Sequence, residues 1–375
     1  MAPPLRLVLL AHPGLPRVDS LQAALAAAGH QAASVVAWQD WLRNPDCLLP
    51  HLSSSSGDPV WLKLEAPGEA PGCLDQLLDL SARAAGLAPP APLLPGELAH
   101  GALGHAGFQA ALHGLQAQLA AHPAVRCFNP PADILAMADK LACQQTLQAA
   151  GVPVPPLLGA ISSFEELVEK LRQTGRRRVF VKPRYGSSAA GVVALESDGH
   201  GRYRATSSVE MVDTDDPASP RLFNSLRIRR YAGPQLPRLI DALAPHAPYL
   251  EQWVPKPRLG RHSFDLRVLT LARQACHRVA RLAPHPLTNL HLGNQRGAVE
   301  DCLDPAAQSQ LASAAASAAA CFPDSLMAGV DIIVNRGRAH VLEMNACGDW
   351  LPRLSWQGQT VHQAEIALME QLSRA

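Results

Sequence analysis

Short apolar runs alternate with helix-like patterns through the first third of the chain. LRLVLLA (5–11) is typical of a buried strand, and SLQAALAAAGH, which follows it, is typical of a helix with a serine N-cap and a glycine stop. WLKLEA and the leucine-rich stretch after it repeat this unit. Alternating strands and helices predict a small parallel α/β domain over residues 1–125, in which the proline-rich piece 87–96 is a surface loop.

Helical spacing marks the start of a second unit after residue 125. Leu135, Leu141 and Leu147 predict one helix, which Gly151 ends because the prolines that follow prevent its continuation. The segment SSFEELVEKLRQTG (162–175) carries a capping box and predicts the next helix.

A hairpin and an irregular stretch follow. RRRVFVKP and GVVALES predict two paired strands that the glycine loop GSSAAG joins. Residues 197–248 predict irregular structure, apart from a basic strand at 222–231.

From Tyr249 onward the pattern is rich in strands, with YLEQWV, FDLRVLTL, HRVARL, GVDIIV and HVLEMN. One alanine-rich helix, 305–321, interrupts them, and its small residues suit packing against a sheet. The second unit therefore spans residues 126–375, with one lobe at about 155–248 and another at about 249–375.

Composition narrows the class of protein. The net charge is +1 and 17% of the 375 residues are charged, so nothing attracts the chain in bulk to nucleic acid or to an anionic membrane. The chain has no apolar run long enough to span a membrane, and its eight cysteines form no CxxC pair. These features favour a cytoplasmic protein without membrane or nucleic-acid partners.

The glycine loop GSSAAG occupies residues 186–191. Its glycines are spaced as in a P-loop, but Val192 stands where a P-loop requires lysine, so it is not a Walker A site. A hydroxyl-bearing loop close to Lys182 can still fold its backbone N–H groups over phosphate oxygens. The alternative is an ordinary glycine-rich turn.

Two carboxylates and an amide predict a metal site near the end of the chain. Glu343 and Asn345 lie two residues apart on a strand, so both face the same side. Asp331 shares that side if the turn between the two strands has an odd number of residues. Such oxygen ligands suit Mg²⁺, whereas the alternative is a pair of carboxylates that face solvent at strand ends.

FDLRVLTL and HRVARL supply a third group of polar residues. Asp265 and Arg267 share a strand face, and Arg281 on the neighbouring strand joins them in a suitable register. The carboxylate could bind a sugar diol while the guanidinium groups face phosphate or carboxylate oxygens. A structural Asp–Arg pair is the alternative.

Taken in order, these motifs resemble those of the ATP-grasp superfamily. The matching segments are DK (139–140), GVPVP (151–155), VKPRYGSSAAGV (181–192), LEQWV (250–254), FDLR (264–267), ARL…TNLHLGN (280–294) and GVDIIV…LEMNACGD. The resemblance covers about residues 126–355. Within the superfamily, the motifs FDLR and LEMN are similar to those of glutathione synthetases and of the ligases that add glutamate to ribosomal protein S6. It implies an α/β protein with α+β lobes, in which a small Rossmann-like parallel domain precedes the ATP-grasp fold.

The resemblance also implies a role for each matching residue. Lys140 and Lys182 would hold the phosphates and the adenine edge of ATP, and Asp265 would bind the ribose. The loop residues Gly186, Ser187, Ser188 and Gly191 would close over the triphosphate, and Glu251, Gln252 and Val254 would contact adenine. Arg267, Arg281 and Asn289 would form the catalytic group. Asp331, Glu343 and Asn345 would bind Mg²⁺, usually two ions, with Mn²⁺ as a substitute.

The implied activity is ligation of a small-molecule or peptide carboxylate to an amine or similar nucleophile through an acyl phosphate. An ATP-grasp kinase that acts on a small anionic substrate is one alternative, and a non-catalytic nucleotide-binding regulatory protein is another. Related ligases are often homo-oligomers, and the resemblance allows one here.

The chain also departs from its relatives, so the resemblance does not name the substrate. ACGDWLPRL replaces the usual Ser-Pro or Pro-Gly stretch after Asn345, and Trp350 within it is expected in the core. Arg227, Arg229 and Arg230 form a basic group that could recognise an anionic substrate. Arg17, Lys63 and Glu65 are candidates for acceptor contacts, with polar surface positions as the alternative.

Overall fold

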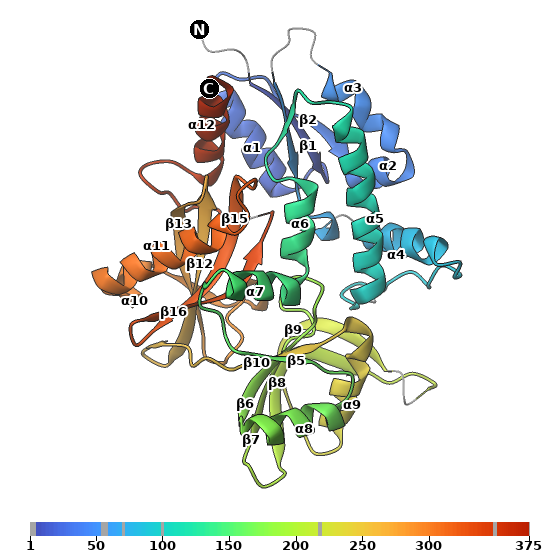
Figure 1. Cartoon of the computed structure of the whole chain (residues 1–375), viewed down its shortest axis with the longest axis vertical. Helices are drawn as coiled ribbons and strands as arrows, with labels where there is room; N and C mark the ends of the chain where they lie inside the picture. The colour runs from blue at the N-terminus through green and yellow to red at the C-terminus, as the bar shows by residue number, and fades with distance from the viewer. Residues whose placement is uncertain are drawn as a thin grey trace.

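Three β-sheets organise the chain in the computed structural model, which describes residues 5–53, 59–69, 72–98, 101–216, 220–347 and 351–374 (Figure 1). Trp350 and part of the ACGDWLPRL stretch lie outside the described residues. Within the described residues, none of the helices is long and apolar enough to cross a membrane.

The first sheet is parallel, with the order β2-β1-β3-β4, as the alternation of strands and helices predicts. Its strands are β1 (Arg6–Ala11), β2 (Ser34–Ala37), β3 (Val60–Leu64) and β4 (Val125–Cys127). The helices of this region are α1 (Pro16–Ala27), α2 (Trp38–Arg43), α3 (Leu49–Leu52), α4 (Cys73–Ala84) and α5 (Gly101–Ala120). Helix α1 begins four residues before the expected serine cap, because Pro16 occupies its first position, where the missing N–H costs nothing.

Helix α5 is absent from the prediction, and its glycines explain why. Four glycines within GALGHAGFQAALHG lower helix propensity. Gly107, however, lies where α5 meets α4: a Cβ at this position would lie 1.8 Å from the carbonyl oxygen of Leu77. A residue type that argues against a helix in isolation therefore permits the close contact of two helices.

The single helix expected to end at Gly151 is two helices, α6 (Pro131–Ala138) and α7 (Lys140–Ala149). Asp139 separates them and caps α7, because its carboxylate accepts a hydrogen bond from the N–H of Ala142 at 3.1 Å. The same carboxylate forms a bidentate pair with Arg184, which precedes the glycine loop. The break in the helix thus fixes Lys140 at the N-terminus of α7.

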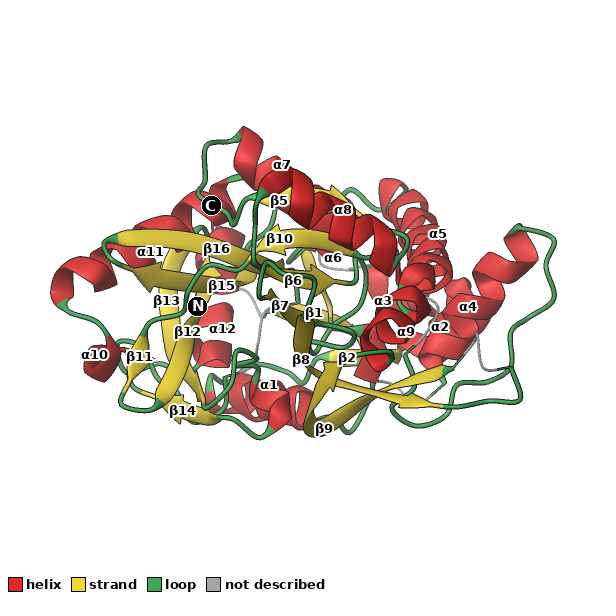
Figure 2. Cartoon of the chain, turned by 90° about the horizontal axis from the view of Figure 1, so that it is seen from below, coloured by secondary structure: helices red, strands yellow, loops and turns green. Residues whose placement is uncertain are grey.

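The second sheet is antiparallel and forms the lower lobe in Figure 1, with the order β5-β10-β6-β7-β8-β9. Its strands are β5 (Leu157–Ala160), β6 (Arg178–Lys182), β7 (Val193–Ser197), β8 (Tyr203–Val212), β9 (Arg221–Ala232) and β10 (Tyr249–Gln252). Helices α8 (Phe164–Thr174) and α9 (Gln235–Ala242) pack against it (Figure 2). The predicted hairpin of β6 and β7 around the glycine loop is confirmed.

The prediction of irregular structure over 197–248 is wrong, because this stretch contains β8 and α9 as well as the expected basic strand β9. Strand β8 places two serines, Ser207 and Ser208, fully inside the lobe. Their hydroxyls bond the carbonyl of Val192 and the side chain of Asn224. Polar residues satisfied in this way remove the apolar pattern by which a strand is recognised.

The third sheet, also antiparallel, has the order β14-β13-β12-β15-β16, with β11 beside β12. Its strands are β11 (Arg258–Leu259), β12 (His262–Leu271), β13 (Gln274–Ala283), β14 (Gln295–Gly297), β15 (Met327–Asn335) and β16 (Arg338–Asn345). The expected alanine-rich helix, α11 (Pro305–Ala320), packs on it after the short α10 (Val299–Cys302). The last helix, α12 (Val361–Arg374), lies beside α1, and its Ile366 and Met369 share a core with Leu7 and Leu9.

Candidate functional site

One cleft collects residues from the second sheet, the third sheet and α7. Its open space, including the part continuous with solvent, is about 710 Å³. The expected site residues on its wall are Lys140, Lys182, Ser187, Glu251, Gln252, Val254, Asp265, Arg281, Asn289, Asp331 and Glu343. Gly186, Ser188, Gly191 and Arg267 are not part of the wall, although each adjoins or contacts a residue that is. Asn345 is not part of the wall either, and lies two residues beyond Glu343 on the same strand.

The cleft combines apolar walls with a buried ion pair. The apolar side chains include Phe180, Val192, Leu287, Ile333 and Leu342. Lys182 pairs with Glu251, which is 1% exposed and whose Oε2 atom has no partner in the described residues. Burial raises the pKa of Glu251, and the charge of Lys182 opposes this. A flat ring with polar edges would fit between such walls.

Asp331 and Glu343 lie directly opposite each other on β15 and β16. The turn between these strands has two residues, Arg336 and Gly337, both with positive φ, and not the odd number that was the expected condition. A β-bulge supplies the missing residue: the register shifts between Asp331 and Ile332, which leaves Leu342 as the extra residue of β16. Glu343 and Asn345 therefore face the same side as Asp331.

Each of the three expected metal ligands already has a protein partner. Glu343 pairs with Lys140, and Asp331 pairs with Arg267 and with Arg281, the latter at 2.9 Å. The side-chain nitrogen of Asn345 donates to the carbonyl of Gly329 at 3.3 Å, which leaves its Oδ1 atom for another ligand. In the described part of the chain no cluster of three His, Cys, Asp or Glu residues could hold a metal, so the expected set depends on this amide.

The charge around Glu343 favours its ionised form. Burial raises the pKa of this carboxyl, but the positive charge of Lys140, helped by Lys182 and Arg267, outweighs burial and holds the pKa below its ordinary value. A carboxylate that is ionised at neutral pH is the form that binds a divalent cation.

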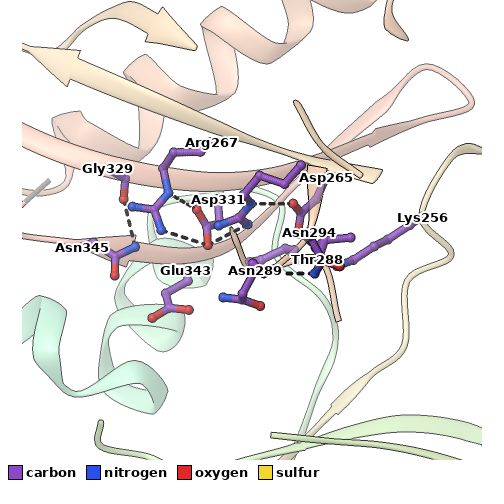
Figure 3. A network of polar contacts seen from close by, with 12 residues as sticks. Lys256, Asp265, Arg267, Thr288, Asn289, Asn294, Gly329, Asp331, Glu343 and Asn345 are labelled. Atoms are coloured by element: carbon purple, nitrogen blue, oxygen red, sulfur yellow. Dashed lines mark hydrogen bonds and ion pairs between the residues drawn. The ribbon is translucent and has the colours of Figure 1, made fainter. Parts of the chain in front are cut away.

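A row of alternating charges runs along the cleft and ends at Arg267, just outside its wall (Figure 3). It runs through Lys256, Asp265, Arg281, Asp331 and Arg267, and the Lys256–Asp265 and Arg281–Asp265 contacts are 3.0 and 2.8 Å. In Figure 3, Glu343 and Asn289 point away from this row toward the same side. The expected grouping of Asp265, Arg267 and Arg281 is thus observed, whereas Lys256 is absent from the expected site.

The glycine loop is held in a strained shape. Ser188 and Ala189 have φ values of 59° and 56°, which residues with side chains rarely adopt. Gly191, with φ of 78°, passes so close to Pro183 that a Cβ would lie 2.5 Å from its Cγ atom. Strain of this kind persists where the surrounding structure enforces it, as it does around loops that bind ligands.

Asn129 is a second residue that the sequence did not single out. Its side chain accepts a hydrogen bond from the N–H of Met327 at 3.1 Å and donates to the carbonyls of Met327 and Ala346. Met327 begins β15, which carries Asp331, and Ala346 directly follows Asn345. Through these bonds Asn129, which is 5% exposed, ties the ends of both strands that carry the expected metal ligands to the segment after β4.

The other candidates for substrate contacts differ in their exposure and in their partners. Lys63 and Glu65 are not surface residues: they are 3% and 4% exposed and pair with each other at 2.9 Å. On β9, Arg229 pairs with Glu210 at 2.5 Å. Arg227 and Arg230 are exposed and make no ion pair within the described ranges.

Neither protein-family models nor curated protein sequences match the chain. Solved structures match it over almost its whole length. D-cycloserine synthetase DcsG is 15% identical, with 98% of this chain and 99% of that chain covered and a TM-score of 0.53. ATP-grasp ligase PsnB, complexed with minimal precursor, Mg and ADP, is 16% identical, with coverage of 100% and 99% and a TM-score of 0.55.

D-alanine–D-alanine ligase from Bacillus anthracis, complexed with ATP, is 10% identical to the chain, with coverage of 100% and 98% and a TM-score of 0.54. At sequence identities this low, the structural matches establish the fold alone. The chain therefore has the ATP-grasp fold, in which a parallel α/β sheet is combined with two antiparallel sheets, as its ordered motifs predict.

Proposed function

We propose that the protein is an ATP- and Mg²⁺-dependent ligase that activates a carboxylate as an acyl phosphate for attack by an amine or a similar nucleophile. The observation that carries the proposal is the cleft on whose wall Lys140, Lys182 and Glu343 come together, between the two antiparallel sheets of an ATP-grasp fold. Similar structures support it, because PsnB is described with Mg and ADP and the D-alanine–D-alanine ligase with ATP.

The charges of the cleft support a requirement for divalent cations. Five cationic side chains, those of Lys140, Lys182, Lys256, Arg267 and Arg281, face four carboxylates, those of Glu251, Asp265, Asp331 and Glu343. A triphosphate that carries roughly four negative charges at neutral pH would leave this region strongly negative. Two divalent cations would restore the balance, which is the number that the resemblance implies.

The residues present fit Mg²⁺. Asp331, Glu343 and Asn345 offer hard oxygen donors on one face of two paired strands, and Mn²⁺ accepts the same donors. When bound, the metal would neutralise charge on the phosphate oxygens. Lys140, which pairs with Glu343 in this structure, would then be available to the phosphates.

The remaining residues of the cleft would orient the reactants. Arg281 and Arg267 are held by Asp331 at fixed positions, where their guanidinium groups can stabilise charge on the transferred phosphoryl group. The side chain of Asn289 lines the cleft and has no partner in the described residues, so its amide can bond a substrate oxygen. The strained glycine loop would cover the triphosphate and exclude water.

The test is incubation with Mg-ATP and panels of carboxylates, peptides and amines, with release of ADP as the measurement. Hydroxylamine should convert the acyl phosphate into a hydroxamate. A hydroxyl-phosphorylating kinase would release ADP without hydroxamate, and a regulatory protein would release no ADP above background across the panel. Either outcome would overturn the ligase proposal.

A matched pair of variants tests the site itself. Lys140→Met should weaken ATP binding by about tenfold or more, because a hydrogen bond between charged groups is lost. Lys170→Met removes a partly exposed lysine from α8, outside the cleft, and should leave ATP binding within about twofold. Equal ATP affinity in both variants would contradict the assigned site.

A further inference from the structure

Lys256 is a buried lysine in the cleft with an unused donor. Its side chain is 8% exposed and follows β10 and the segment expected to contact adenine. An ammonium group has three N–H donors. Two of them reach Asp265 Oδ2 at 3.0 Å and Thr288 Oγ1 at 2.5 Å, and no third partner occurs in the described ranges. Because Lys256 lines the cleft, a ligand bound there could accept a hydrogen bond from the remaining donor.

The position of Lys256 along the charged row indicates which part of a ligand it would meet. In Figure 3 it lies at one end of the charged row and Asn345 at the other, with Asp265 and Asp331 between them. Lys256 is two residues beyond Val254, and its charge lowers the pKa of Glu251. It therefore lies near the segment expected to contact adenine and at the far end of the row from Asn345.

Asp265 is not available in the way that the resemblance implies. It is 2% exposed, and its Oδ1 atom accepts a hydrogen bond from Arg281 at 2.8 Å. Its Oδ2 atom accepts from Lys256 and from the hydroxyl of Thr288, the latter at 2.5 Å. A ribose hydroxyl could reach this carboxylate only by replacing one of these donors. In this arrangement Asp265 and Thr288 fix the position of the Lys256 ammonium.

The positive charge of the Lys256 ammonium is only partly neutralised by the charges around it. Burial lowers the pKa of Lys256, and the Asp265 carboxylate opposes this effect. The positive charges of Arg281 and Lys182 lower the pKa further. A buried cation that shares its one carboxylate with an arginine gains from an additional oxygen acceptor.

We propose that Lys256 donates its remaining N–H to the nucleoside monophosphate part of the bound nucleotide, at a ribose or α-phosphate oxygen, with Asp265 and Thr288 as its positioning residues. This inference rests on the proposed function, because it assumes that ATP occupies the cleft. It moves the contact with this part of ATP from Asp265 to Lys256.

Isothermal titration calorimetry with adenosine, AMP, ADP and ATP tests the proposal. Lys256→Met should weaken AMP, ADP and ATP by a similar factor of about tenfold. Lys140→Met should weaken ADP and ATP but not AMP, because Lys140 lies at the Glu343 end of the cleft. Loss of adenosine binding in Lys256→Met would identify a ribose contact, whereas unchanged adenosine binding would identify the α-phosphate.

Threonine variants separate a positioning role from a general loss of structure. Thr288→Val removes one bond to the ammonium and should reproduce the uniform weakening of AMP, ADP and ATP by a smaller factor. Thr270→Val provides the control, because Thr270 is equally buried but bonds the carbonyl of Ala328. It should leave the affinities of all nucleotides unchanged, whatever its effect on the melting temperature.

The two proposals fail in different ways. If the wild-type protein binds ATP and Lys256→Met binds AMP and ATP as tightly as the wild type, only the assignment of Lys256 is overturned. A melting temperature near the wild-type value would confirm that this variant is folded. If the wild-type protein binds no nucleotide, the proposed function fails first and the assignment of Lys256 fails with it.

Discussion

Replacement of Lys63 by methionine tests how α12 is held against the first sheet. Lys63 on β3 contacts both oxygens of Glu365 on α12 at 3.1 Å, and it pairs with Glu65 at 2.9 Å. All three side chains are at most 4% exposed. Methionine would preserve the packing of the lysine stem but leave two buried carboxylates without their shared cation.

The expected cost is about 3 kcal/mol, near the lower end of the range for removal of one partner from a buried ion pair. The lower end applies because each carboxylate keeps one other contact: Glu65 has Arg17 at 3.1 Å, and Glu365 has His362 at 3.0 Å. Since proteins are typically stable by only about 5–15 kcal/mol, this loss should be evident in urea unfolding. Lys170→Met, at a more exposed position, should change the free energy of unfolding by less than about 0.5 kcal/mol.

The pH dependence gives an independent measurement. Burial opposes ionisation of Glu365, but Lys63 and His362 lower its pKa from 4.5 to about 2. A depressed carboxyl pKa stabilises the fold above the unfolded value, so this contribution is present above pH 4.5 and is lost as the pH falls toward 2. The shift corresponds to about 3 kcal/mol. Lys63→Met should therefore lose stability near neutral pH and depend less on pH in this window.

The reasoning would be refuted if Lys63→Met cost less than about 1 kcal/mol at neutral pH, or if wild type and variant lost stability in parallel between pH 4.5 and 2. Either result would mean that the buried carboxylates find other partners or water when the lysine is removed.

Three further predictions concern the loop, the metal site and the lobe. Gly191→Ala should weaken ATP binding in calorimetry, because its Cβ would lie 2.5 Å from Pro183 at a φ of 78°; unchanged affinity would contradict the strained loop. Asn129→Leu should weaken Mn²⁺ binding measured by electron paramagnetic resonance, whereas Asn335→Leu, at an exposed bond to Pro255, should not. Glu97→Gln breaks the pair with Arg221 and should speed hydrogen exchange of the Asn224 amide, which bonds Gly96 at 2.7 Å; equal exchange would exclude a role for this pair in tethering β9.

The polar motifs were sufficient to predict most of the polar residues on the cleft wall, because ligand contacts require particular atoms at particular spacings. Lys140, Lys182, Glu251 and Glu343 come from four different elements, yet the structure brings them to one cleft. Lys256 was not predicted, because a lone lysine between two prolines has no motif. The available signal was the scarcity of lysine: the chain has only five lysines, and three of these line the cleft.

Secondary structure was predicted where local patterns agree with tertiary packing and missed where packing overrides them. The apolar runs of β1, β6 and β15 are buried strands, as expected. In contrast, buried serines interrupt the apolar pattern of β8, and α5 contains Gly107, which its close contact with α4 requires. Both depend on partners that lie far along the chain, which single-sequence reasoning cannot see.

The face on which the metal ligands lie depends on a single inserted residue. Strand residues alternate sides, so the number of residues between Asp331 and Glu343 decides whether they meet. A turn of three residues would bring them together, and so does the observed turn of two residues with a bulge at Leu342. Both arrangements are compatible with the same sequence spacing, so the sequence predicts the three ligands but not the route by which they converge.

The bulge lies beside Glu343, and Leu342 itself lines the cleft and accepts a hydrogen bond from Lys182 at 3.4 Å. The irregularity that aligns the expected metal ligands therefore also shapes the neighbouring wall of the cleft.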